Sequence, residues 1–121
     1  MTKIFITGDR SVDPLNAISH VLAVVQRVNE DGLVDSSTEP ELYTDSFETG
    51  VPRAVKYLYP EAKELVHSLT DEGYPALDEL YEHANTEMDL VYFVHTDAFN
   101  SRVGMALMSK VDSDKLQLVV N

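Results

Sequence analysis

The chain contains no cysteine, and none of its apolar runs is long enough to cross a lipid bilayer. Without cysteine, a disulfide, a thiolate metal site and a thiol nucleophile are all excluded. A membrane helix needs about 20 consecutive apolar residues, so we expect no membrane span. The first residues lead directly into a strand pattern, without the basic segment and apolar core of a signal peptide. We therefore expect a cytoplasmic protein.

Positive charge is also scarce, because 9 lysines and arginines are outnumbered by 21 acidic residues, which gives a net charge of −12. A field of this sign repels duplex DNA and anionic membranes, and the chain has no lysine-rich stripe to release counterions. The four histidines share no ligand spacing on one element, so we expect no metal and no other cofactor. Nucleic acids and membranes are therefore not expected partners.

What the chain does contain is an alternation of strand and helix patterns along 121 residues, a length suited to one domain with one core. The β-branched and aromatic run at residues 3–7 predicts a strand that ends at Gly8. Pro14 suits the first turn of a helix over residues 14–29. The apolar residues of that helix recur at helical spacing: Leu15, Ile18, Leu22 and Val25.

The same alternation continues to the end of the chain. It predicts a strand at 41–45, a helix from Gly50 that stops at Pro60, a helix at 74–84, a buried strand at 88–95, a helix at 101–111 and a strand at 116–120. Residues 61–69 fit a helix or a strand, and we favour a strand at 65–69 because it completes the alternation. Such a pattern implies right-handed crossovers and a parallel sheet. The sequence therefore predicts one α/β domain over residues 1–121, with a three-layer, open parallel sheet of about five strands.

Three of the four arginines lie just beyond a predicted strand, in or beside the turn that opens the next helix: Arg10, Arg53 and Arg102. Each turn also carries a glycine: Gly8, Gly50 and Gly104. Such turns meet at the carboxyl edge of a parallel sheet, where ligands bind. Arginine, bare backbone amides and helix N-termini suit a phosphate or a carboxylate. We expect an anion or nucleotide site there; the alternative is that the arginines are solvated or paired with nearby carboxylates.

Polar residues beside these turns complete the candidate site. Asp9 and Asp97 are placed to meet ribose hydroxyls or to act as acid and base, although aspartate is also a common turn residue. Asn100 or Ser101 is expected to cap the helix that follows. The expected ligand-binding residues are Thr7, Gly8, Asp9, Arg10, Gly50, Arg53, Asp97, Asn100, Ser101, Arg102 and Gly104. No nucleophile elbow, P-loop lysine or strict GxGxxG motif is present.

These turns lie in three longer blocks. They are Ile6-Thr7-Gly8-Asp9-Arg10, Thr49-Gly50-Val51-Pro52-Arg53-Ala54, and Asp89-Leu90-Val91-Tyr92-Phe93-Val94 followed by Asn100-Ser101-Arg102-Val103-Gly104-Met105. In order and spacing they resemble the SLOG superfamily of Rossmann-like nucleotide-binding proteins, in particular its small single-domain branch from bacteria and phages. The resemblance implies a strand order of 3-2-1-4-5, a phosphate held by the three arginines, and dimerisation through helices that flank the sheet.

The chain also departs from that family. Pro52 stands where the family has aspartate and Met105 where it has threonine, so two polar ligand contacts are missing. The helix after Gly104 lacks the carboxylate that enzymatic relatives use as a nucleophile, which argues against cleavage of a glycosidic bond. The leading hypothesis is therefore non-catalytic binding of a nucleotide or nucleotide-derived ligand, as a sensor or a sequestering module.

Two other hypotheses stay open at this point. One is a protein-interaction domain with a degenerate site, whose acidic segments at 29–48, 61–64 and 71–72 would meet a basic partner. The other is a nucleotide N-glycosidase or phosphoribohydrolase that uses Asp9, Asp97 or Glu48 as its carboxylate.

Overall fold

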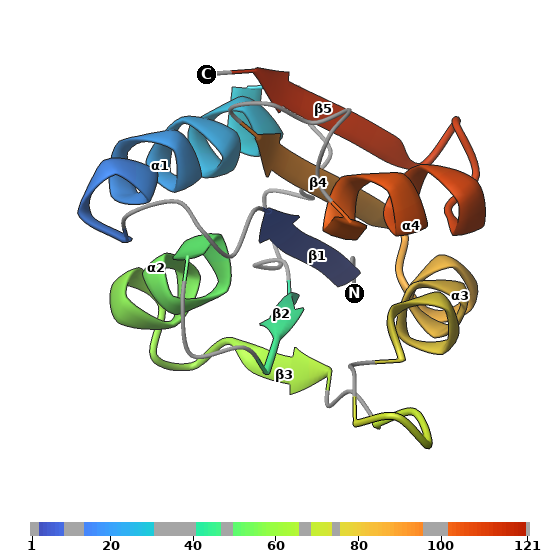
Figure 1. Ribbon diagram of the computed structural model, residues 1–121. Helices are drawn as coiled ribbons and strands as arrows, with labels where there is room; N and C mark the ends of the chain where they lie inside the picture. Colours follow the sequence, from blue (N-terminus) through green and yellow to red (C-terminus); the bar gives the residue numbers. More distant parts are fainter. Residues whose placement is uncertain are drawn as a thin grey trace.

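The computed structural model describes residues 3–8, 14–30, 41–46, 50–65, 69–73, 76–95 and 102–120. Strands and helices alternate along this part of the chain (Figure 1). The elements are β1 (Lys3–Gly8), α1 (Pro14–Glu30), β2 (Glu41–Asp45), α2 (Gly50–Leu58), β3 (Lys63–Leu65), α3 (Leu77–Glu87), β4 (Leu90–His95), α4 (Arg102–Lys110) and β5 (Leu116–Val120). None of the described helices is both long and apolar enough to cross a membrane.

The five strands form one sheet in which every neighbouring pair is parallel, in the order β3-β2-β1-β4-β5. The predicted α/β class, parallel sheet and strand order are thereby confirmed. From β1 the chain builds outward through β2 to β3, and it then crosses to the other side of β1 to add β4 and β5. The topological switch point therefore lies between β1 and β4, which pair from Ile4↔Leu90 to Gly8↔Val94.

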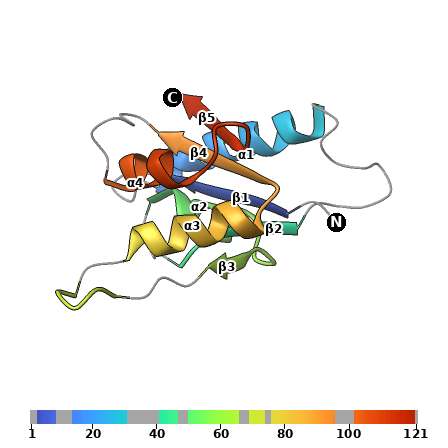
Figure 2. The same cartoon turned by 90° about the vertical axis from the view of Figure 1, so that its right-hand side faces the viewer.

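Two helices cover each face of the sheet, which explains why the central strands are apolar on both faces. Helices α1 and α2 pack together on one face, and α3 and α4 lie side by side on the other (Figures 1 and 2). Alternate residues of β1 enter the two cores: Ile4 and Ile6 pack under α1 and α2, and Phe5 packs under α3 and α4. Full burial of a side chain of this size stabilises the fold by about 1.5–3 kcal/mol.

Helix α1 begins at Pro14 as predicted, but it turns a different stripe of residues toward the sheet. Its buried side chains are Ala17, Val21 and Val24. Leu15 and Leu22, which belong to the apolar stripe seen in the sequence, are 77% and 47% exposed. Both stripes follow helical spacing, so periodicity alone does not choose between them, and packing against α2 and β4 decides.

Two other elements start at residues other than those predicted. The third strand begins at Lys63, before the predicted start at Leu65, because a tight turn in which Ala62 N–H donates to the Tyr59 carbonyl (2.9 Å) returns the chain to the sheet early; its described part ends at Leu65. Of the predicted strand, residues 66–68 lie outside the described residues. Helix α3 runs over Leu77–Glu87 and not 74–84, although it buries the predicted face of Leu77, Leu80, Tyr81 and Ala84.

Candidate functional site

Gly8 ends β1 at a position where neighbouring atoms leave no room for a side chain. A Cβ atom there would lie 2.3 Å from the carbonyl oxygen of Val94 in β4 and 2.6 Å from a methyl group of Val51 in α2. Real Cβ atoms essentially never come within 3.0 Å of other heavy atoms. The absence of a side chain on Gly8 therefore lets the end of β1, the end of β4 and the first turn of α2 meet at the switch point.

Gly50 starts α2 with a backbone angle φ of +65°. This left-handed conformation costs other residues roughly 1–2 kcal/mol, so the turn into α2 favours glycine. Three residues later, Arg53 lies in the first turn of the helix and is exposed to solvent. Gly50 and Val51 thus place the N-terminus of α2, with an exposed arginine in its first turn, at the carboxyl edge of the sheet.

The four helices differ in the charge of their first turns. Helices α1, α2 and α4 have no acidic residue there, whereas α3 begins with Asp78 and Glu79. Acidic side chains are favourable in a helix first turn because they interact with the partial positive charge of the N-terminus. In a chain with 21 acidic residues, three of the four described helices therefore have no carboxylate in their own first turn.

A buried polar cluster lies beneath this edge, between the sheet and α3. The Asp45 carboxylate ends β2 and is fully buried. Its Oδ2 atom accepts a hydrogen bond from the Thr7 hydroxyl of β1 and another, 3.3 Å long, from the Tyr81 hydroxyl of α3. On the opposite face of β2, the Thr44 hydroxyl donates to the Ile6 carbonyl at 2.8 Å. These contacts join the ends of β1 and β2 to α3.

Asp45 is the residue that sequence reasoning missed. It ends a strand at the carboxyl edge, which is the position where an acidic residue meets the ribose in dinucleotide-binding folds. The position of Asp45 at the end of a strand could have identified it as a candidate site residue. The strand pattern at 41–45 is short and weak, so the end of this strand was not predicted to carry site residues. Here the burial of Asp45 and its bonds to Thr7 and Tyr81 give it a structural role in holding β1, β2 and α3 together.

The structure brings together part of the predicted site. Thr7 and Gly8 end β1, and the first turn of α2, with Gly50 and Arg53, packs against Gly8 through Val51. Gly104 is buried within α4, and Arg102 opens that helix. The other predicted site residues lie outside the described residues: Asp9, Arg10, Asp97, Asn100 and Ser101. The described segments contain no group of three or more histidine, aspartate or glutamate residues able to hold a metal ion.

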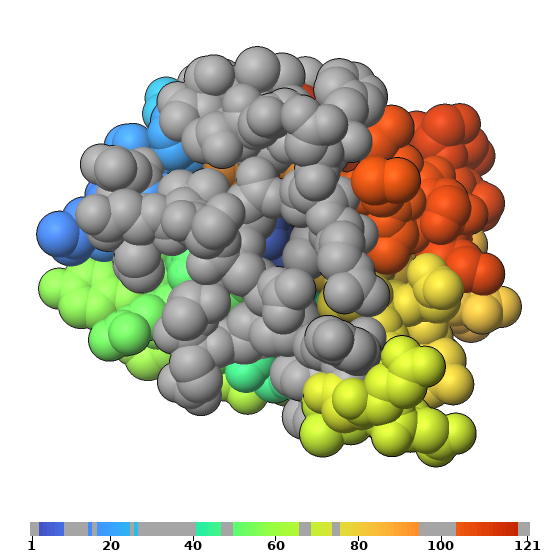
Figure 3. All heavy atoms as spheres, viewed as in Figure 1, coloured from blue at the N-terminus to red at the C-terminus, as the bar shows by residue number. Residues whose placement is uncertain are grey.

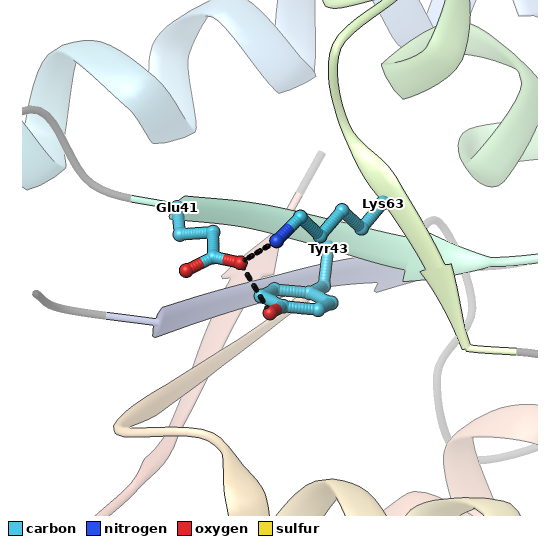
Figure 4. Close-up of polar contacts among 3 residues, drawn as sticks. All are labelled: Glu41, Tyr43 and Lys63. Carbon is cyan, nitrogen blue, oxygen red and sulfur yellow. Dashed lines mark hydrogen bonds and ion pairs between the residues drawn. The ribbon is translucent and has the colours of Figure 1, made fainter.

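A second polar cluster joins β2 to β3, away from the carboxyl edge (Figure 4). Glu41 accepts hydrogen bonds from the Lys63 ammonium group and from the Tyr43 hydroxyl, the latter at 2.5 Å. The bond from Lys63, and then that from Tyr43, lowers the pKa of Glu41. The same contacts with Glu41 raise the pKa of Tyr43 and of Lys63. Because Glu41 starts its strand, we assign this cluster to strand pairing.

Comparisons with known proteins returned no match to any family model, curated protein or solved structure.

Proposed function

We propose that the protein binds a nucleotide or nucleotide-derived ligand at the carboxyl edge of the sheet, beside the switch point between β1 and β4, without turning it over. The observation that carries this proposal is the contact between Gly8 and Val51. It sets the first turn of α2 against a strand end that carries no side chain. Open parallel sheets bind ligands at this place in the topology.

The chemistry of α2 suits an anionic group. Its first turn presents the backbone N–H groups of residues other than Pro52, which has none; such groups have no partner within the helix, and the helix dipole adds partial positive charge. Arg53 supplies a guanidinium group in the same turn, and the described first turn of α2 contains no carboxylate. A phosphate is the group that such a combination binds best. The order of the three sequence blocks, similar to that of SLOG proteins, supports a nucleotide as the carrier of that phosphate.

Among the described residues, the carboxylates near the edge favour binding without turnover. Cleavage of a glycosidic bond needs a carboxylate that can reach the sugar. Asp45 is fully buried and accepts hydrogen bonds from Thr7 and Tyr81, so it is held away from a ligand. Helix α4, which corresponds to the nucleophile-bearing helix of enzymatic relatives, has no acidic residue over Arg102–Lys110.

A thermal-shift screen against nucleotides, cyclic dinucleotides, NAD and ADP-ribose derivatives tests the proposal. A ligand at ~100 times its Kd should add about 2.7 kcal/mol to the free energy of unfolding, which raises Tm by several degrees. We expect the shift to be lost in Arg53→Gln and kept in Lys110→Gln, which removes the same charge from the last turn of α4. Arg10→Ala and Arg102→Ala test the other two predicted arginines.

Two results would contradict this function. If no member of the panel raises Tm, or if Lys110→Gln abolishes the shift as fully as Arg53→Gln, the ligand is not held at the N-terminus of α2. Chromatography of each nucleotide after incubation tests the second part of the proposal. Release of a free base or of ribose 5-phosphate would show that the protein is an enzyme.

A further inference from the structure

An open groove of about 630 Å³ lies between the start of α3 and the outer side of α4. The described residues that line the groove include Thr70, Leu77, Asp78, Glu79, Met105 and Ala106. Figure 3 shows residues 69–73 (yellow-green), α3 and α4 together on the right-hand side of the molecule. The groove is separate from the first turn of α2, because α2 lies on the opposite face of the sheet.

Large apolar side chains are exposed at and beside this groove. Met105 lines it and is 60% exposed, and Met108, one helical turn further along α4, is 41% exposed. Leu69, which precedes the lining residue Thr70, is 65% exposed. Leu77 contributes a buried apolar wall that belongs to the core. Methionine is enriched at protein-binding surfaces because its unbranched, polarisable side chain adapts to the partner.

The charged side chains among the described residues at the groove are acidic. Asp78 and Glu79 line it, and the exposed Asp71 and Glu72 follow Thr70 in the chain. None of the described residues that line the groove is a lysine or an arginine. Carboxylates beside an apolar surface repel a phosphate, so a nucleotide is a poor occupant. A second copy of this chain is also disfavoured, because the net charge of −12 on each copy opposes association.

We propose that this groove docks a cationic amphipathic segment of a partner protein. Apolar side chains of the segment would pack on the exposed Met105, and its lysines or arginines would face Asp78 and Glu79. Complementary charge steers association and fixes orientation, while the apolar contact supplies most of the affinity. An amphipathic helix laid in a groove is a recurrent form of this recognition. The inference is independent of nucleotide binding at α2.

The test measures binding of a dye-labelled, amphipathic lysine–leucine helical peptide by fluorescence anisotropy. A scrambled peptide of the same composition has equal charge but no apolar face, and it serves as the ligand control. Asp78→Asn with Glu79→Gln should weaken binding about tenfold, since two charge pairs are lost. Met105→Gln should weaken it about fivefold, and because this side chain is largely exposed the variant is expected to fold.

Matched variants elsewhere on the surface distinguish binding at the groove from nonspecific electrostatic or hydrophobic binding of the peptide. Glu61→Gln with Asp114→Asn removes the same number of charges from exposed sites, and Leu15→Gln removes an exposed apolar side chain from α1. Both should change the affinity less than about twofold. The proposal is overturned if the wild-type protein does not bind saturably, if the scrambled peptide binds equally well, or if the matched variants lose as much affinity as the groove variants. Sedimentation that shows self-association through Met105, with no competition from the peptide, would assign the groove to a second copy.

Discussion

The hydroxyl of Thr7 donates a buried hydrogen bond to the carboxylate of Asp45, a residue 38 positions further along the chain. Both side chains are fully buried, and the bond crosses from the end of β1 to the end of β2. A buried carboxylate costs several kcal/mol unless hydrogen bonds replace its water. Thr7 therefore belongs to the framework that supports the proposed ligand site, because its hydroxyl donates to the Oδ2 atom of Asp45.

Replacement of Thr7 by valine tests this role. The shape of the side chain is retained while the donor to Asp45 is lost, so we expect the free energy of unfolding to fall by about 1–3 kcal/mol. Urea unfolding followed by circular dichroism measures the change. Thr86→Val is the matched control. Thr86 is exposed on α3, so this substitution should lower the free energy of unfolding by no more than about 0.5 kcal/mol. Equal effects of the two substitutions would refute a framework role for Thr7.

Tyr81→Phe should cost less than Thr7→Val. The Tyr81 hydroxyl donates to Asp45 over 3.3 Å, at the long end of hydrogen-bond distances, while its ring packs against Phe5 with centroids 6.3 Å apart. Phenylalanine keeps the ring contact and loses only the hydroxyl. We expect destabilisation of about 0.5–1.5 kcal/mol by urea unfolding. A loss larger than that of Thr7→Val would show that Tyr81, and not Thr7, is the principal partner of the carboxylate.

The elements and their order were largely predictable because they depend on local pattern. Strands β2 and β5 occupy the predicted residues, and the apolar run of β4 is buried from Val91 to Val94, as expected for a strand covered on both faces. Alternation of strands and helices implied the parallel sheet. The strand order came from the resemblance to a family, since crossover handedness does not by itself fix which side of β1 receives β4.

Features that depend on tertiary contacts were not predictable. Nothing near Asp45 in the sequence shows that Thr7 and Tyr81 will converge on its carboxylate, because those partners are 38 and 36 positions away. The need for glycine at position 8 was visible only as a turn signal. Its physical basis is the approach of Val94 and Val51 from two other elements. The exposed side chain of Leu15 was likewise indistinguishable from a core residue by spacing.

Gly8→Ala should be among the most damaging small substitutions in the chain. The added methyl group would meet the Val94 carbonyl, which is backbone and cannot rotate away, so β1 and β4 must separate locally. Overpacking of this kind costs about 1–3 kcal/mol or more. Gly73→Ala is an informative comparison, because Gly73 has a φ of +87° but nothing within 4 Å of an added Cβ. Gly73→Ala should lower the free energy of unfolding only by the roughly 1–2 kcal/mol that the left-handed backbone conformation costs alanine. A smaller loss at Gly8 than at Gly73 would contradict the observed packing.

Acid stability should depend on the contact between Glu41 and Lys63. The pKa of Glu41 is lower in the folded protein than its ordinary value of 4.5, chiefly because of the hydrogen bond from Lys63. The contribution of the Glu41 carboxylate to the free energy of unfolding is therefore complete above pH 4.5 and is lost as the pH falls through the lowered pKa. Lys63→Met should raise the pKa of Glu41 toward 4.5 and flatten the fall in stability between neutral and acidic pH. The effect should be small because the pair is exposed to solvent and screened.

The titration of the Glu41 side-chain carboxyl carbon by NMR gives the direct measurement, with Lys56→Met as the control. Lys56 forms its ion pair with Glu64, at 3.2 Å, so its loss should leave the pKa of Glu41 unchanged. At high pH the direction of the pH dependence reverses, and stability falls as the pH rises. The pKa values of Tyr43 and Lys63 are raised, so their contributions persist below the ordinary values of 10.0 and 10.5 and disappear as the pH rises through the raised ones. A Glu41 pKa that does not move in Lys63→Met would show that the pair is not formed in solution.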